Sequence, residues 1–282
     1  MKPDQKFLRL PKDFWAHIRL ISQEVGYTVR GQKRIKIPTI EEMQGAFDKL
    51  SLDSKHLFDR KGNTTEYGCL VCDYLAYRAR ILEKYVEPLL MTAEEAKDIF
   101  DRLHRKFQPQ CPIPLNKQSE PKKAPAFFTG IINMLIEANA KRTPCDYDPR
   151  TLTTVTHKQR PVRTLARRID GAFPSAVNPV AVWEIKEYYY TTTFGSRVAD
   201  GVYESLLDGM ELEELRLSEG FDVKHYLMID AHYTWWVCGR SYLCRIVDML
   251  HMGYVDEVLF GREVLKRLPK LVREWIGTVR RR

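Results

Sequence analysis

The sequence lacks any long apolar segment. No run of about 18 apolar residues occurs along its 282 residues, so we expect no membrane-spanning helix. The opening stretch, MKPDQKFLRLPKDFW, also lacks the apolar core of a secretory signal peptide. These two absences predict a cytoplasmic protein that does not associate with a membrane.

A second absence concerns paired metal-binding cysteines. Cys69 and Cys72 form one CxxC pair, but no second pair and no histidine pair follows at zinc-finger spacing. Both residues fall in a stretch with helical periodicity, and we interpret them as thiols on one helical face in the core. A cytosolic protein keeps such cysteines reduced, so no disulfide framework is expected.

The charge of the chain is unevenly distributed. The net charge is +8, and residues 141–168 hold eight basic residues against Asp146 and Asp148, whereas residues 199–222 hold eight acidic residues against Arg216. A basic band beside an acidic helix is typical of a protein that binds a phosphate backbone. Ordinary solvated charge on helix and loop surfaces is the alternative.

The chain divides into three parts by pattern. Residues 1–108 read as an N-terminal helical region, with capping boxes at Thr39/Glu42 and Thr92/Glu95. Residues 109–125 are rich in proline and form a connector. The basic stretch before Thr39 is a possible DNA-recognition wing and helix; a helical scaffold or dimer contact is the alternative.

Residues 126–282 predict an α/β domain. Apolar periodicity indicates a helix, three successive strands, a helix, a strand and further helices, which implies a mixed sheet flanked by helices. The expected strands are residues 151–163, 165–173, 179–190 and 225–236, and the expected helices are residues 126–141, 196–217, 241–254 and 262–276.

The strand expected over residues 179–190 is mostly apolar, as a buried strand would be, but it also carries charged residues. In AVWEIKEYYY, from residue 181, side chains alternate between faces, so Glu184 and Lys186 share one face while Trp183 and Ile185 share the other. An unpaired buried charge is costly, so each needs a partner or a metal ion. Asp170 lies on the preceding expected strand, fourteen residues before Glu184. A hairpin of that length brings the two carboxylates together as an oxygen-rich site suited to Mg²⁺.

The arrangement Asp170-x₁₃-Glu184-Ile185-Lys186 resembles the PD-(D/E)xK nuclease superfamily, which includes many restriction endonucleases, over residues 126–250. The resemblance implies a restriction-endonuclease-like core in which Asp170, Glu184 and the Ile185 carbonyl hold Mg²⁺, for which Mn²⁺ can substitute. It implies that Lys186 orients or deprotonates the attacking water. Glu137 matches a place where some members carry a further acidic ligand. Ile169 stands where the family motif has proline.

Basic and polar residues near this motif are candidate contacts to double-stranded DNA. Phosphate contacts position the backbone without reading its sequence, and helix N-termini attract phosphate. The candidates are Lys158, Arg160, Arg163, Arg167, Arg168, Ser196 and Arg197.

These features predict a Mg²⁺-dependent DNA endonuclease, specifically a type II restriction enzyme acting as a homodimer on double-stranded DNA. Three alternatives stay open. The chain could be another nuclease of this superfamily, in defence, repair or transposition, that cuts without sequence specificity. It could keep the fold for DNA binding alone. The charged residues could form a structural salt-bridge cluster on the sheet.

Overall fold

The centre of the protein is a mixed five-stranded sheet with the strand order β1-β4-β5-β6-β7. The computed structural model describes residues 1–116, 124–190 and 195–281. β4 pairs antiparallel with β1 and β5, whereas β5, β6 and β7 run parallel. The strands are β1 (Asp146–Tyr147), β4 (Gly171–Phe173), β5 (Ala181–Glu187), β6 (Lys224–Asp230) and β7 (Glu257–Phe260).

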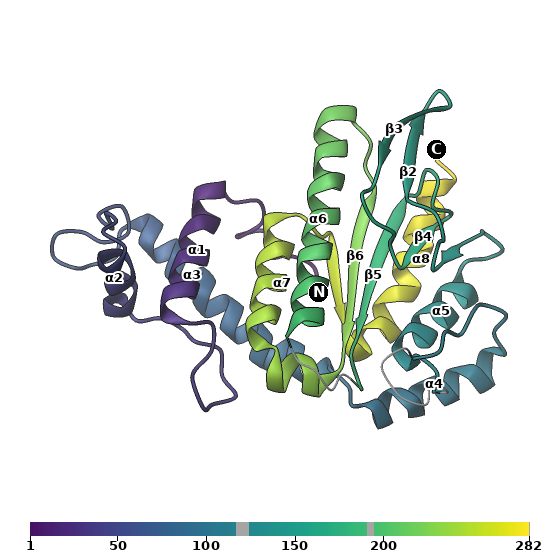
Figure 1. Cartoon of the computed structure of the whole chain (residues 1–282), viewed down its shortest axis with the longest axis horizontal. Coiled ribbons are helices and arrows are strands. Elements are labelled where there is room, and N and C mark those ends of the chain that lie inside the picture. Colours follow the sequence, from purple (N-terminus) through teal and green to yellow (C-terminus); the bar gives the residue numbers. More distant parts are fainter. Residues whose placement is uncertain (117–123, 191–194, 282) are drawn as a thin grey trace.

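Helices cover both faces of this sheet (Figure 1). On one face, α4 (Ala93–Phe107), α5 (Phe127–Asn139) and α8 (Val264–Val279) enclose an apolar cluster that includes Trp183 and Met228. On the other face, α6 (Ser196–Glu219) and α7 (Arg240–Met252) pack over Val182, Leu227 and Ile229. The mixed α/β architecture expected from the sequence is therefore confirmed.

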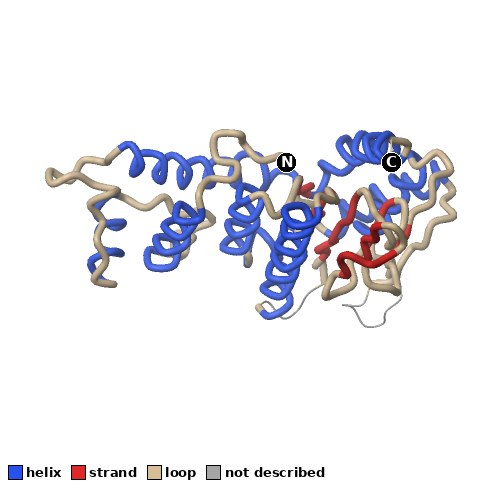
Figure 2. The backbone as a smooth tube through the Cα atoms, turned by 90° about the horizontal axis from the view of Figure 1, so that it is seen from above, coloured by secondary structure: helices blue, strands red, loops and turns tan. Residues whose placement is uncertain are grey.

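The first helices form a separate layer beside the sheet, seen at the opposite end of the molecule in Figure 2. α1 (Lys12–Val25), α2 (Ile40–Lys49) and α3 (Glu66–Ile81) share their own apolar cluster. Both predicted capping boxes are present, at the starts of α2 and α4. A buried ion pair joins this layer to α7, because Arg78 Nη1 lies 2.9 Å from Asp248 Oδ2 and Tyr74 donates to the same carboxylate.

β5 has the alternation that its sequence predicts. Trp183 faces α8 and stacks on Trp275, with ring centroids 5.5 Å apart and an interplanar angle of 6°. Glu184 and Lys186 are buried on the α6 side. Gly171 pairs with Trp183, and a Cβ at position 171 would meet the Trp183 ring at 2.2 Å, so only glycine allows β4 to approach so closely.

Other elements differ from their expected limits. The strand expected over residues 225–236 ends at Asp230, and η3 (Tyr233–Cys238) continues as a π-helix because its tryptophans fold back under α7. The strand expected over 165–173 is short, since only Gly171–Phe173 pairs with the sheet. The segment 151–163 forms a separate hairpin, β2 (Thr154–His157) and β3 (Arg160–Thr164), outside the main sheet. β1 and β7 were not expected.

The helix α4 packs on α5 and on the apolar cluster of the sheet, although the sequence-based division placed it in the N-terminal region. The division into residues 1–108, 109–125 and 126–282 itself stays a prediction, and residues 117–123 of the connector lie outside the described residues. After α3, the chain passes through η1 (Leu82–Val86) and η2 (Glu87–Leu89), and η4 (Gly261–Glu263) precedes α8. Cys69 is exposed and Cys72 half-buried, so the expectation of a core thiol is wrong for Cys69. No helix in the described parts is long and apolar enough to span a membrane.

Candidate active site

Asp170 and Glu184 lie side by side where β4 begins, along the side of β5 that pairs with β4. The backbone N–H of Ile185 donates to Asp170 Oδ2 at 2.7 Å, and the N–H of Asp170 donates to Glu184 Oε1 at 3.2 Å. These two bonds fix both carboxylates against the same short piece of backbone. The N–H and C=O groups of a strand residue point to the same edge, so the Ile185 carbonyl faces Asp170 as well.

The two carboxylates reach this edge from different sides. Glu184 lies on the α6 side of β5. Asp170 lines, with Ile185 and Glu187, a cavity of about 650 Å³ whose wall also includes Thr129 and Asn133 from α5. A ligand in this cavity would therefore reach Asp170 first, with Glu184 and Lys186 behind the strand edge.

Lys186 is held against Glu184. Its Nζ lies 2.7 Å from Glu184 Oε2 and 3.0 Å from Glu204 Oε2, and Trp235 Nε1 donates to its carbonyl oxygen at 3.3 Å. Burial alone would lower the pKa of Lys186, but the negative charges of Glu184 and Asp170 outweigh burial and raise it. The ammonium therefore stays charged in this arrangement.

Gly201 makes room for the side chains of Lys186 and Tyr188. α6 crosses β5 closely at Gly201, where a Cβ would lie 3.2 Å from Lys186 Cδ and 2.7 Å from the Tyr188 hydroxyl. The next inward positions along α6 are Glu204 and Asp208, at helical spacing from Gly201.

Arg167 completes the cluster. Its Nη1 lies 3.0 Å from Glu184 Oε1 and 2.6 Å from Asp208 Oδ2, and its Nη2 lies 3.3 Å from Glu204 Oε2. From the sequence we expected Arg167 to lie on a strand and contact DNA. In the structure it lies in a loop, and its guanidinium forms ion pairs with acidic residues of the protein itself. Its partners on α6 were not identified from the sequence, although the spacing of Gly201, Glu204 and Asp208 marks one helical face.

The pKa values of the carboxylates in the cluster shift in different directions. Burial raises the pKa of Asp170 to about 6, and the neighbouring negative charge of Glu184 adds to the rise. Burial also raises the pKa of Asp208 to about 7. Burial alone would raise the pKa of Glu184 too, but the charges of Lys186 and Arg167 reverse the effect and lower it. Two carboxylates pushed toward different charge states beside a fixed cation are typical of functional sites.

Other predicted site residues lie elsewhere. Both carboxylate oxygens of Glu137 accept from the backbone N–H of Gln110 at 3.1 Å, and no described contact joins Glu137 to the acidic pair. The structure therefore does not bring Glu137 to the expected metal ligands, because the end of α5 faces the connector.

The remaining basic candidates are spread over the surface. Lys158 and Arg160 are exposed on the β2–β3 hairpin, Arg168 is exposed beside Arg167, and Arg163 lies 3.1 Å from Glu214 Oε2. Ser196 and Arg197 are exposed in the first turn of α6. The hypothesis that these residues contact DNA stays a prediction.

The fold and the cluster define a mixed α/β protein in which a half-buried Asp170 lies beside a buried Glu184 that pairs with Lys186. Residues 91–275 match the family described as domain of unknown function (DUF7687), and residues 1–85 match a second one, domain of unknown function (DUF7690). Because the first match covers more than half of the chain, the protein belongs to the DUF7687 family. No curated protein and no solved structure matches the chain.

Proposed function

We propose that this protein is a Mg²⁺-dependent DNA endonuclease of the PD-(D/E)xK kind, and specifically a type II restriction enzyme. One observation carries the proposal: the Asp170 carboxylate accepts from the Ile185 amide, the Asp170 N–H donates to Glu184, and Lys186 Nζ lies 2.7 Å from Glu184. The elements of the main sheet and its flanking helices follow the order α5–β1–β4–β5–α6–β6 once the separate β2–β3 hairpin is left out, with β5 parallel to β6. This order supports the proposal, since the resemblance implies an α-β-β-β-α-β order, although its first strand is β1 and not the expected segment 151–163.

The residues present fit a divalent cation. The cluster supplies hard carboxylate and carbonyl oxygens, the ligand type that Mg²⁺ prefers. The raised pKa of Asp170 arises in part from repulsion by Glu184, and a cation between them would relieve that repulsion. Among the described residues, no group of three acidic, histidine or cysteine side chains forms a ready-made site, so the ligands would be Asp170, Glu184 and the Ile185 carbonyl.

The chemistry divides among these groups. A bound Mg²⁺ would supply Lewis-acid stabilisation of the negative charge that develops on the phosphate during hydrolysis. Asp170 and Glu184 would hold the cation, with Mn²⁺ as a substitute. Lys186 would donate hydrogen bonds to the attacking water and to the phosphate, which suits a lysine with a raised pKa better than proton abstraction.

Cleavage of plasmid and phage DNA with Mg²⁺ tests the proposal. The wild-type protein should cut, and Asp170→Ala, Glu184→Ala and Lys186→Ala should each lower the rate by about 100-fold or more while DNA binding persists. Asp200→Asn is the matched control, because Asp200 is an exposed carboxylate on α6 one turn before Glu204. Failure of the wild type to nick DNA with either Mg²⁺ or Mn²⁺ would contradict the proposal.

The product pattern tests specificity, and the assembly state tests the dimer. Discrete fragments with common end sequences would identify a restriction enzyme, whereas a smear would identify a nuclease of the same kind that cuts without sequence specificity. We propose a homodimer that cuts one strand per subunit, and ultracentrifugation with and without DNA checks it. A monomer under both conditions would exclude the dimer.

A second candidate function is DNA binding without cleavage. The position of Arg167 favours it, because its guanidinium already neutralises the Glu184 carboxylate that a metal ion would need. This alternative predicts salt-dependent DNA binding that Asp170→Ala leaves unchanged, together with no cutting by the wild type.

A further inference from the structure

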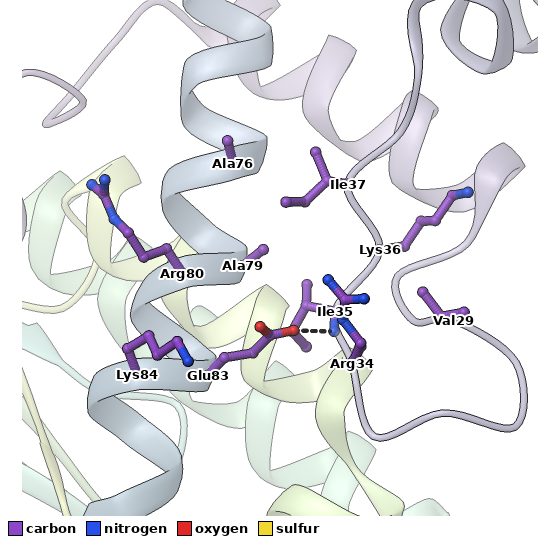
Figure 3. Close-up of a pocket in the computed structure, with 10 residues that line it drawn as sticks. All are labelled: Val29, Arg34, Ile35, Lys36, Ile37, Ala76, Ala79, Arg80, Glu83 and Lys84. Carbon is purple, nitrogen blue, oxygen red and sulfur yellow. Dashed lines mark hydrogen bonds between the residues drawn. The ribbon is translucent and has the colours of Figure 1, made fainter.

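A groove lies between a basic hairpin and the end of α3, far along the chain from the acidic pair. The basic hairpin comprises residues 28–36, closed by the Thr28–Ile35 bridge and by the Val29 N–H donating to the Arg34 carbonyl at 3.1 Å. The groove encloses about 300 Å³ (Figure 3). Its lining residues are Val29, Arg34, Ile35, Lys36, Ile37, Ala76, Ala79, Arg80, Glu83 and Lys84.

The walls of the groove are cationic. The hairpin holds four basic residues and no acidic one, and α3 and η1 add Arg80 and Lys84. Glu83 is the acidic lining residue, and one of its oxygens accepts from the Ile35 N–H at 2.9 Å, as Figure 3 shows. Arg34, Arg80 and Lys84 are exposed and make no ion pair with any residue that the structure describes.

The basic hairpin is tied to the segment that supports the acidic pair. Arg240 Nη2 donates to the Gln32 carbonyl at the hairpin tip at 3.1 Å, and Arg240 begins α7 two residues after η3 ends. Within η3, Thr234 Oγ1 donates to the Tyr188 carbonyl at 2.8 Å, just beyond the end of β5. In Figure 1 the loop between α1 and α2 lies on the α7 side of the sheet, and α5 lies on the other side. A polyanion that contacts both would have to run past η3 and the start of α7, the segment that the Arg240 and Thr234 hydrogen bonds join to the basic hairpin and to the end of β5.

We propose that this groove binds the sugar-phosphate backbone of the DNA duplex whose scissile phosphate lies at Asp170 and Glu184. The inference rests on the proposed nuclease function and adds a second point of attachment. Exposed cations without acidic partners complement a phosphate backbone. The lining residues include no aromatic ring on which an unpaired base could stack, which favours a duplex over a single strand. Contacts of this kind hold DNA without reading its sequence.

The test is a triple substitution, Arg34→Ala, Arg80→Ala and Lys84→Ala, with binding to a labelled duplex measured in the absence of divalent cations. A plot of log affinity against log salt concentration has a negative slope, and its magnitude should decrease by about 2 to 3. Each lost phosphate contact removes about 0.9 from that magnitude. The matched control replaces Lys55, Arg60 and Lys61 with alanine, since these exposed cations lie in the loop before the opposite end of α3. That control should keep the wild-type slope.

The outcomes separate this inference from the proposed function. If the wild type cuts DNA and the triple variant keeps the wild-type salt slope, the groove proposal is wrong and the nuclease proposal stands. If the salt slope falls in the variant while the wild type never cuts, the groove binds DNA as proposed but the nuclease proposal fails. A wild type that binds no duplex overturns both. If polyglutamate competes as well as DNA of equal charge, the groove takes an acidic protein instead, and the proposal is wrong.

Discussion

The guanidinium of Arg167 lies 3.0 Å from the carboxylate of Glu184, so a loop residue neutralises the central acid of β5. The same guanidinium reaches Asp208 on α6. Arg167 therefore ties a strand, a loop and a helix together at the candidate active site. Its first role in the structure is to stabilise two buried acids.

Arg167→Ala should destabilise the fold by about 2 to 3 kcal/mol, because it leaves the buried Asp208 carboxylate without its cation and leaves Glu184 with Lys186 alone. Asp208 is especially affected, since its Oδ1 has no hydrogen-bond partner among the described residues. Urea unfolding followed by circular dichroism measures the loss. The exposed neighbour Arg168 provides the control, and Arg168→Ala should change the free energy of unfolding by less than about 0.5 kcal/mol. Equal effects from both substitutions would contradict the assigned role.

Asp170 should make stability depend on pH with a defined sign. Its pKa is raised to about 6 in the folded protein from an ordinary value of 3.8, so the folded state holds the proton more tightly. The contribution of Asp170 to the free energy of unfolding should be greatest below about pH 4. It should fall by at most about 3 kcal/mol as the pH rises through 6. The buried acids Asp208 and Asp230, whose pKa values are raised to about 7, contribute slopes of the same sign.

The difference between wild type and Asp170→Asn isolates this contribution. Asp170→Asn should remove part of the slope between pH 4 and 6. Above pH 6, Mg²⁺ should raise the melting temperature of the wild type but not of the variant. Thermal unfolding across pH with and without Mg²⁺ checks both. A slope that survives unchanged in the variant would show that Asp170 titrates normally.

Gly201→Ala should lower DNA cleavage while leaving the stability of the fold nearly unchanged. Alanine favours a helix by up to about 1 kcal/mol over glycine, but the new methyl would crowd Lys186 Cδ at 3.2 Å. We expect a free energy of unfolding within about 1 kcal/mol of wild type and DNA cleavage lower by roughly 10- to 100-fold. Gly45→Ala on α2, where a Cβ meets nothing within 4 Å, should leave cleavage unchanged. Full cleavage by the Gly201 variant would mean that Lys186 can shift without consequence.

Asp248→Ala should weaken the packing between the segment of residues 1–85 and the segment of residues 91–275. Arg78, in the segment matched at 1–85, and Asp248, in the segment matched at 91–275, form a buried ion pair at 2.9 Å. Removing one partner leaves a buried charge, which costs about 3 to 5 kcal/mol. Calorimetry should show one unfolding transition in the wild type and two in the variant. Asp256→Ala, at a half-exposed position, should keep a single transition.

The sequence predicted the local parts of this fold more accurately than its long-range contacts. Alternation on β5 correctly assigned Glu184 and Trp183 to opposite faces, because strand geometry depends only on neighbouring residues. The capping boxes at Thr39 and Thr92 were confirmed for the same reason. The end of β6 at Asp230 was not predicted, because η3 is as apolar as the strand before it.

The contacts of the candidate site depend on how distant segments pack. Arg167 and Asp208 are forty-one residues apart, and no local pattern indicates that they are 2.6 Å apart in the fold. Glu137 had the right residue type on the right helix, but it bonds to the connector rather than to the acidic pair. Residue type and spacing therefore indicated the acidic pair and its lysine. The role of Arg167, whose charge neutralises Glu184 and Asp208, depends on tertiary packing and could be seen only in the structure.

The stack of Trp183 on Trp275 lies immediately behind Glu184, on the opposite face of β5. Indole emission depends strongly on the distance and orientation of neighbouring rings. A cation or duplex that shifts the strand edge should therefore change the intrinsic fluorescence of the unlabelled protein. On the proposed function, this change in emission would report binding at the acidic pair, and Trp275→Phe should remove the part of it that arises from the stack without altering a candidate ligand.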